Sequence, residues 1–210
     1  MGPFEPRSAG RREGALRTAP TAQPISAPIA PERIETFRMV GERLALDHED
    51  DLATLLLDPR VAETMWSPRE TRTRADVRAG LERKLLHWHR HGFGQWFFRD
   101  GATGAMVGRG GPQHTMASGR DEVEIGWVIT PERWREGLAT ELANASVEIA
   151  FGPLALSEVI AYTQPHNIAS RRVMEKAGFV YERDITFARE LFVLYRRCRG
   201  RPWGSAHAHC

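Results

Sequence analysis

The stretch Asp121–Thr140, DEVEIGWVITPERWREGLAT, places the strongest constraint on the fold. Its first half alternates as an extended strand does, with Val123, Ile125, Trp127 and Ile129 on one side and Glu122, Glu124, Gly126 and Val128 on the other. Pro131 ends the strand, because proline cannot donate to a ladder and biases Thr130 away from helix. Gly137 then opens an amphipathic helix. The stretch therefore predicts a strand, a turn and a helix in succession.

The start of that helix is a predicted anion site. The first amides of a helix lack partners within the helix, and the helix dipole favours negative charge there. A phosphate bound at this point would lie beside the strand face that carries Glu122 and Glu124. The turn is not a P-loop, because no Gly-Lys-Ser/Thr follows Gly137, and it is not a dinucleotide-binding G-x-G-x-x-G. The alternative is an ordinary strand-to-helix turn in which Gly137 supplies backbone freedom.

Composition narrows the class of protein. The chain has 210 residues, of which 41% are hydrophobic and 27% charged, which is typical of one globular domain. A net charge of +2 is too small to indicate nucleic acid as the main partner. No run approaches the ~18 apolar residues of a membrane span, and the N-terminus lacks the apolar core of a signal peptide. The two cysteines give no disulfide framework, which fits a reducing compartment. These features predict a cytoplasmic protein without membrane partners.

The chain divides into three parts by composition. Residues 1–32 are rich in Pro, Ala, Gly and Arg without an apolar period, and are expected to form a disordered leader. Residues 33–198 hold all the periodic segments and are expected to form one domain. Residues 199–210 are expected to form a flexible tail. No internal repeat and no second domain are evident.

The periodic segments predict the fold class. The stretch Thr36–Leu46 is expected to hold a first strand, centred on Leu44–Asp47 with some lead-in. A helix that begins at His48, with acidic residues in its first turn, is expected to follow. Residues 110–112, Gly-Gly-Pro, are expected to bend or end a strand, and residues 114–120 to form a loop. The full order is a strand, two or more helices, three strands, a helix, a strand, a helix and two strands. This order predicts a single α/β (α+β) domain whose mixed central sheet carries helices on its faces.

Two motifs resemble those of one family. The turn Trp134–Thr140, WREGLAT, resembles the pyrophosphate loop Gln/Arg-x-x-Gly-x-Gly/Ala of the GNAT acetyltransferase superfamily, whose Rim-type (ribosomal-protein N-acetyltransferase) branch often has tryptophan in the first position. The stretch Asn167–Phe179, NIASRRVMEKAGF, resembles the family's Asn-x-x-Ser-x-x-x-x-x-Lys-x-Gly-Phe segment at the expected distance. The resemblance covers roughly residues 34–197, and two ordered motifs are much more specific than either alone.

The resemblance implies a site for acetyl-CoA in a gap between two splayed central strands, from which the acetyl group passes directly to an amine. The backbone of Val128 and Ile129 would hydrogen-bond the pantetheine arm. The amides expected to hold the pyrophosphate are those of Arg135, Glu136, Gly137, Leu138, Ala139 and Thr140. Arg133 and Arg135 are candidates to pair with phosphates. Asn167 and Ser170 would face the thioester end, although Asn167 is also a plausible helix N-cap.

Glu124 is the candidate general base, acting directly or through water, because the attacking amine must be neutral. Rim-type enzymes often carry a glutamate there; the alternative is a cross-strand partner for an arginine. Glu122 lies nearer the strand start and is expected to be a rim charge. A backbone N–H near Val128 is the expected oxyanion donor. Many family members protonate the thiolate with a tyrosine seven residues after the asparagine; Met174 stands there, which leaves Ser170 as a weaker, water-assisted candidate.

The family resemblance implies an N-acetyltransferase. The missing tyrosine at Met174 motivates one alternative, a non-catalytic acyl-CoA-binding or sensing module on the same fold. An unrelated α/β interaction domain is a third. No metal site is expected, because His87 and His91 share a helix face without a carboxylate at ligand spacing.

The acceptor stays open among a protein N-terminus, an aminoglycoside-like molecule, a polyamine and an amino acid, with the Rim-type resemblance favouring a protein N-terminus. Its choice is assigned to residues 51–91 and to the loops near residues 112–120. A monomer and a homodimer are both compatible with the sequence.

Overall fold

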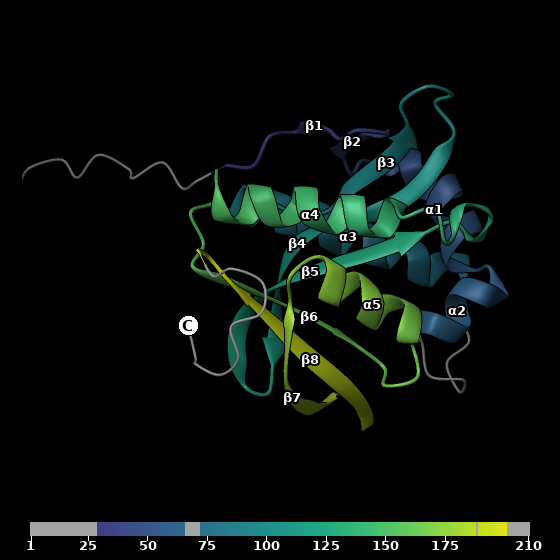
Figure 1. The fold of residues 1–210 in the computed structure, drawn as a ribbon. Helices are drawn as coiled ribbons and strands as arrows, with labels where there is room; N and C mark the ends of the chain where they lie inside the picture. Colours follow the sequence, from purple (N-terminus) through teal and green to yellow (C-terminus); the bar gives the residue numbers. More distant parts are fainter. Residues whose placement is uncertain (1–28, 66–71, 188, 201–210) are drawn as a thin grey trace, which may run out of the picture.

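The structure, a computed structural model, describes residues 29–65, 72–187 and 189–200. Figure 1 shows one twisted sheet with helices on both faces. The strands are β1 (Arg33–Glu35), β2 (Met39–Arg43), β3 (Trp96–Asp100), β4 (Met106–Ala117), β5 (Arg120–Ile129), β6 (Glu158–Thr163), β7 (Val180–Phe187) and β8 (Glu190–Cys198). The helices are α1 (Glu49–Leu56), α2 (Pro59–Met65), α3 (Arg74–His91), α4 (Leu138–Phe151) and α5 (Ile168–Lys176), with short 3₁₀ turns at Leu46–His48 and Pro131–Arg133.

The sheet is mixed, as expected, and its one parallel pair lies at its centre. The strand order is β1-β2-β3-β4-β5-β6-β8-β7, and all neighbours are antiparallel except β5 and β6. Those two strands pair at a single position, Glu124 opposite Ile160. Beyond that pair they separate, so the edge of β5 from Ile125 to Ile129 has no paired strand on the β6 side. The splay expected from the family resemblance is therefore present.

Alternating side chains divide the core between the two faces of the sheet. Trp96 and Phe98 of β3 pack with Ile129 and with Leu142 of α4. Phe97, between them, packs instead with α1 and α3 on the opposite face. Figure 1 shows α4 in front of the sheet and α3 behind it. The alternation of side chains along the strands thus covers both faces of the sheet with apolar packing. Helices from both faces line the gap where β5 and β6 separate.

The beginning of the domain differs from the sequence prediction. The strand lies at Met39–Arg43 rather than Leu44–Asp47, because it pairs with β3 from Met39 opposite Asp100 to Arg43 opposite Trp96 and ends where β3 begins. Of the expected leader, residues 1–28 lie outside the described residues, whereas Ala30 and Pro31 pack on the domain. Ala30 is buried, and the Trp96 indole donates to the Pro31 carbonyl at 3.0 Å.

The β4–β5 hairpin is longer than predicted. Residues 110–112 neither end nor interrupt β4, and its pairing continues to Ala117 opposite Arg120. Ser118 and Gly119 alone form the turn, both with positive φ (52° and 78°), which suits a tight two-residue hairpin. Pro112 is tolerated because it lies opposite Ile125 at a position that requires no donor to β5. The predicted loop at residues 114–120 is therefore wrong.

Two observations bear on membrane insertion and on the state of the cysteines. None of the helices within the described residues is long and apolar enough to cross a bilayer. Cys198, at the end of β8, is disulfide-bonded, contrary to the expectation that the cysteines give no disulfide. The cysteines therefore no longer support a reducing compartment.

Candidate active site

A cleft of about 980 Å³ opens where β5 and β6 separate. Its walls come from the ends of β4, β5 and β6 and from α2, α3, α4 and α5. The expected site residues that line it are Glu124, Val128, Ile129, Arg135, Gly137, Leu138, Ala139, Thr140, Asn167 and Ser170. Glu136 does not line it. The fold therefore brings the two sequence motifs and the central strand to one space.

The loop before α4 presents unpaired backbone amides. Gly137 is the N-cap of α4 with φ 83°, and Arg135 also has a positive φ of 66°. Within the described residues, the amides of residues 135–139 have no hydrogen-bond acceptor, whereas the Thr140 amide donates to the Gly137 carbonyl at 3.1 Å. Five of the six expected amides are thus available to an anion at the positive end of the helix.

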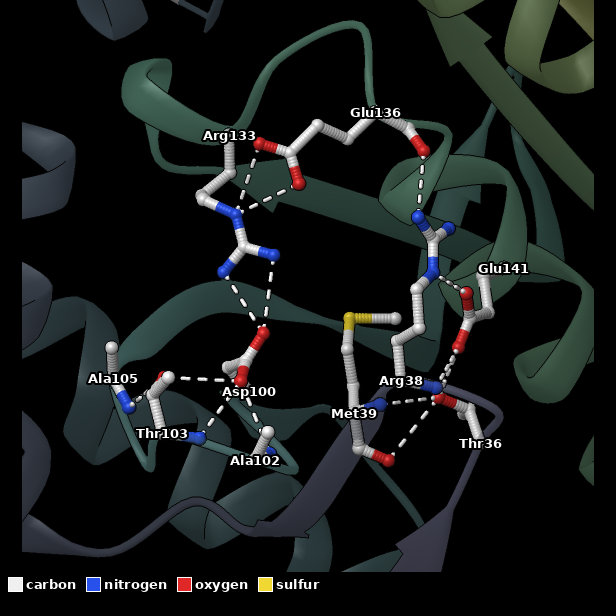
Figure 2. A network of polar contacts seen from close by, with 10 residues as sticks. All are labelled: Thr36, Arg38, Met39, Asp100, Ala102, Thr103, Ala105, Arg133, Glu136 and Glu141. Carbon is white, nitrogen blue, oxygen red and sulfur yellow. Dashed lines mark hydrogen bonds and ion pairs between the residues drawn. The ribbon is translucent and has the colours of Figure 1, made fainter.

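Arg38 fixes this loop from the neighbouring β1–β2 turn (Figure 2). Its Nη1 donates to the Glu136 carbonyl at 2.9 Å, and its Nε donates to Glu141 Oε2 at 2.8 Å. Thr36 Oγ1 donates to the other Glu141 oxygen at 2.6 Å. Burial raises the pKa of Glu141, but the hydrogen bonds from Thr36 and Arg38 outweigh it and hold that pKa below its ordinary value. The first turn of α4 is therefore held by charge-assisted hydrogen bonds.

Arg133 is occupied by protein carboxylates. Its Nε lies 2.9 Å from Glu136 Oε2, and its Nη1 lies 3.1 Å from Asp100 Oδ2 (Figure 2). The Glu136 side chain consequently faces Arg133 rather than the cleft. Both arginines expected to pair with phosphates line the cleft. Arg133 is held by Asp100 and Glu136, whereas Arg135 makes no ion pair within the described residues. Arg133 instead ties the loop to the turn after β3.

The register of β4 and β5 decides which backbone groups face the gap. The Thr130 amide donates to the Val107 carbonyl at 2.8 Å, which makes this a hydrogen-bonded pair. Alternation along the ladder then turns the backbone of Val128 toward β4 and that of Trp127 and Ile129 toward β6. The Ile129 carbonyl accepts from the Trp134 indole at 2.8 Å. Trp127 and Ile129 therefore present their backbone to the cleft, while Val128 contributes its side chain.

Two glutamates on one face of β5 have opposite environments. Glu122 is buried and accepts from both Arg196 Nη atoms, at 2.9 and 3.0 Å, so those hydrogen bonds hold its pKa below the ordinary value. The prediction of a rim charge is wrong, because β8 pairs with β6 and places Arg196 within hydrogen-bonding distance of Glu122. Glu124 makes no ion pair with an arginine within the described residues. Its Oε2 accepts from Gln113 Nε2 at 3.1 Å, and burial raises its pKa.

Lys84, Arg109 and Tyr162 lie close enough to Glu124 to act on its charge. Lys84 of α3 donates to Gln113 Oε1 at 2.9 Å. Burial, followed by the charge of Arg109, lowers the pKa of Lys84 to about 7. The Tyr162 hydroxyl on β6 interacts with the same carboxyl, and burial raises the pKa of that tyrosine. Sequence reasoning missed these residues, because a lone lysine on a helix and a tyrosine in a strand carry no motif.

The second motif forms the start of α5. Asn167 Oδ1 accepts from the Ser170 amide at 3.0 Å, which confirms Asn167 as the N-cap. Its Nδ2 donates to the Thr64 carbonyl of α2 at 3.4 Å, across the cleft. Met174 is buried in the core on the far side of the helix, so it offers no polar group to the cleft.

Comparison with known proteins identifies the family. Residues 38–180 match the family model described as an acetyltransferase (GNAT) domain. The chain belongs to the GNAT acetyltransferase family. Among curated relatives, YkkB of Bacillus subtilis, an uncharacterised protein, is 28% identical over 120 residues, which cover 55% of this chain and 70% of YkkB.

Solved structures share the fold. An acetyltransferase from Agrobacterium tumefaciens superposes with a TM-score of 0.70 and 24% identity, covering 81% of this chain and 96% of that one. RimL, a ribosomal L7/L12 α-N-protein acetyltransferase in complex with coenzyme A, superposes with a TM-score of 0.64 and 14% identity, covering 80% and 98%. The chain is an acetyltransferase with acetyl-CoA as its cosubstrate. Its own residues fit that cosubstrate, because the unpaired amides before α4 provide the anion site that a pyrophosphate needs.

Proposed function

We propose that this acetyltransferase moves the acetyl group of acetyl-CoA to a primary amine, of a small molecule or a protein N-terminus, by direct attack. The observation that carries the proposal is Glu124. It is a carboxyl with a raised pKa and no arginine partner in the described residues, and it lies in the wall of the cleft whose mouth is the open start of α4. Such a group accepts a proton from an attacking amine.

In this proposal the cosubstrate is held by backbone. The amides of residues 135–139 bind the pyrophosphate, with Arg135 and the Thr140 hydroxyl beside them. The backbone of Trp127, which has no paired strand on the β6 side, hydrogen-bonds the pantetheine arm, while the Ile129 carbonyl is already held by the Trp134 indole. Asn167 and Ser170 border the thioester end of the cleft. The backbone groups of β5 and of the loop before α4 are held in place by the fold before acetyl-CoA binds. Less conformational entropy is therefore lost on association.

The chemical step then needs three groups. Glu124 takes a proton from the amine, directly or through water, as the nitrogen bonds to the acetyl carbon. The Ile129 N–H donates to the oxygen that becomes negative. The carbon–sulfur bond breaks, and the thiolate receives a proton from the Tyr162 hydroxyl, with Ser170 as the water-assisted alternative. Protonated Glu124 then returns a proton to the Tyr162 oxygen with which it interacts, so both side chains regain their starting states. Burial raises the pKa of Tyr162, so its hydroxyl is protonated before the step and gives up its proton only as Glu124 supplies another.

The electrostatics of the wall also favour a neutral amine. An α-amine has a pKa of ~7.7–8.0 and a lysine side chain ~10.4, so most amines arrive charged. Lys84 and Arg109 lie near Glu124 and act on its charge. Their positive field disfavours an ammonium at the same place and lowers the pKa of the bound amine.

Turnover of acetyl-CoA with a panel of amines tests this proposal, with release of the CoA thiol and the mass of the product as readouts. Glu124→Gln is expected to lose turnover, whereas Glu63→Gln, the same change on the exposed side of α2, is expected to keep it. Binding of acetyl-CoA without turnover of any amine would favour the non-catalytic acyl-CoA module instead.

Two finer predictions belong to this proposal. The protein is expected to be cytoplasmic, which cell fractionation tests. It is expected to be a monomer or a homodimer, which light scattering on the full chain tests.

A further inference from the structure

A second cavity, of about 370 Å³, opens beside the cleft between α1, α3 and β4. Apolar residues of α1 and α3 form part of its wall, and Lys84, Arg109 and Gln113 line both spaces. The two spaces therefore share a wall next to Glu124. A molecule whose amine lies at Glu124 would place the rest of its atoms in this cavity.

Arg109 is a buried cation that makes no ion pair with a carboxylate of the described residues. It lies in the middle of β4 and is 6% exposed. Its Nη1 donates to the neutral amide oxygen of Gln95, and its Nε has no hydrogen-bond partner in the described part of the chain. Burial lowers the pKa of Arg109 to about 10. Buried arginines are almost always paired, so an unpaired N–H in the wall of a cavity points to a ligand that accepts it.

Lys84 adds a second cation to the same wall. Its Nζ donates to Gln113 Oε1, which also accepts from Gln95 Nε2 at 3.1 Å. Neutral amides thus separate both cations from protein carboxylates. His87, in the same wall, adds no charge near neutral pH, because burial lowers its pKa to about 4.

The acidic groups near the cavity do not balance these cations. Glu124 is the nearest, and its raised pKa shows that it is itself poorly stabilised as an anion. Asp76 lines the cavity but accepts hydrogen bonds from the Thr73 amide and hydroxyl in the N-terminal cap of α3. Arg83 also lines the cavity. The cavity consequently carries an excess of positive charge in a place of low dielectric.

We propose that this cavity binds a carboxylate or phosphate group of the acceptor, with Arg109 and Lys84 as its ligands. The acceptor class is then a small amine that also carries an anionic group, and polycations such as polyamines and aminoglycosides are disfavoured. The anion site stands on the geometry of Arg109 alone, whereas the identification of its ligand as the acceptor rests on the proposed function.

The first test reads Lys84 directly. Lys84 and Lys176 are the only lysines, so protein labelled with ¹³C-lysine gives two resolvable side-chain signals. The pH titration of the Lys84 signal is measured without anion, with inorganic phosphate and with succinate. A bound anion stabilises the charged amine, so the titration is expected to move to higher pH with at least one of them. Unchanged titration with both anions would overturn the proposal.

Two variants locate the effect. Arg109→Met is expected to abolish the shift of the Lys84 signal, and Arg109→Lys, which keeps the charge, is expected to retain part of it. A shift that persists in well-folded Arg109→Met would place the anion elsewhere, for instance at the start of α4, and would overturn the proposal. If Arg109→Met does not fold, Arg109→Gln takes its place in the comparison, because a Lys84 variant would remove the signal that is measured.

The second test compares matched acceptors in the acetyl-transfer assay. The pairs are 4-aminobutyrate with its neutral amide, and 2-aminoethyl phosphate with ethanolamine; spermidine serves as the polycation. The charged member of a pair is expected to have a kcat/KM higher by at least about tenfold, and Arg109→Gln is expected to remove that preference. Equal or greater turnover of the neutral or polycationic amines would overturn the acceptor assignment. An absence of all turnover would refute the proposed function and leave the lysine titration as the separate test of the anion site.

Discussion

Glu122 and Glu124 lie two residues apart on the same face of β5, yet they belong to different regions of the molecule. Around Glu122, where β6 and β8 pair closely, Arg196 is surrounded by the carboxylates of Glu122, Glu158 and Glu182. Around Glu124, at the position beyond which β5 and β6 separate, the cations Lys84 and Arg109 hydrogen-bond to amide oxygens and make no ion pair within the described residues. One region pairs its buried charges and the other does not.

In the proposed mechanism, one strand serves both stability, through Glu122, and chemistry, through Glu124. A paired buried charge has its pKa moved away from the physiological range, so it stays ionised and fixes strands in register. An unpaired group has its pKa moved toward that range, where it can exchange protons. The difference lies in which carboxylate Arg196 reaches. Ile160 of β6 lies opposite both Glu124 and Arg196, yet the Arg196 guanidinium donates to Glu122.

The largest effect is expected for Glu124→Gln. Removal of a general base lowers the rate by roughly 10²–10⁴-fold. Acetyl-CoA binding is expected to persist, because Glu124 is not among the groups that hold the cosubstrate. In the wild type, the acidic limb of kcat/KM against pH is expected above the ordinary glutamate value of ~4.3, since the base acts only above its raised pKa. If Glu124→Gln had the wild-type rate and the same acidic limb of kcat/KM, Glu124 would not be the general base.

Arg196→Met tests the region around Glu122, in which the buried charges are paired. It leaves Glu122 buried beside Glu182 without a cation, which is expected to lower the free energy of unfolding by about 3–5 kcal/mol. Urea denaturation measures this, with Arg90→Met, on the exposed end of α3, as the control expected to change little. A loss no greater than that of the control would show that the paired region does not stabilise the fold.

The sequence predicted the elements with a local signature. The alternation of β5, the N-cap Gly137 of α4 and the N-cap Asn167 of α5 depend on near neighbours in the chain, and all three are confirmed. The beginning of β2 and the length of β4 were mispredicted, because both are set by pairing with distant strands.

The same division applies to the site. The loop before α4 and Glu124 were found from the sequence, since each sits in a recognisable pattern. The gap-facing backbone of Trp127 depends on the register with β4, and Lys84, Arg109 and Tyr162 meet only through tertiary packing. The ion pair of Arg196 with Glu122 rather than with Glu124 likewise depends on the register in which β8 pairs with β6. None of these contacts leaves a local pattern in the chain.

A smaller effect is expected for Glu141→Gln, which weakens the charge-assisted hydrogen bonds from Thr36 and Arg38 that hold the start of α4. Because Arg38 is partly exposed, we expect a loss of about 1–2 kcal/mol of stability, together with weaker acetyl-CoA binding. Urea denaturation and calorimetry on the same samples measure both. Unchanged acetyl-CoA affinity in a destabilised variant would mean that the support of the loop does not matter for binding.

The smallest effect is expected on the stability of Glu122→Gln at acidic pH. Hydrogen bonds from Arg196 depress the pKa of Glu122 below its unfolded value of 4.5, so its stabilisation is complete above that value and is lost as pH falls through the depressed pKa. The free energy of unfolding of Glu122→Gln is therefore expected to decline less steeply than that of the wild type below pH ~4.5. Parallel curves for the two proteins would contradict the pairing.

Calorimetric titration of acetyl-CoA into the purified protein tests the central claim most directly, namely that the start of α4 binds the cosubstrate. Gly137→Asp adds a carboxylate at this anion site, and Gly137→Asn is the matched neutral control that also tolerates the positive φ. The account predicts micromolar binding, ~8 kcal/mol, for the wild type and Gly137→Asn, and its loss in Gly137→Asp. Equal binding by all three proteins would contradict it.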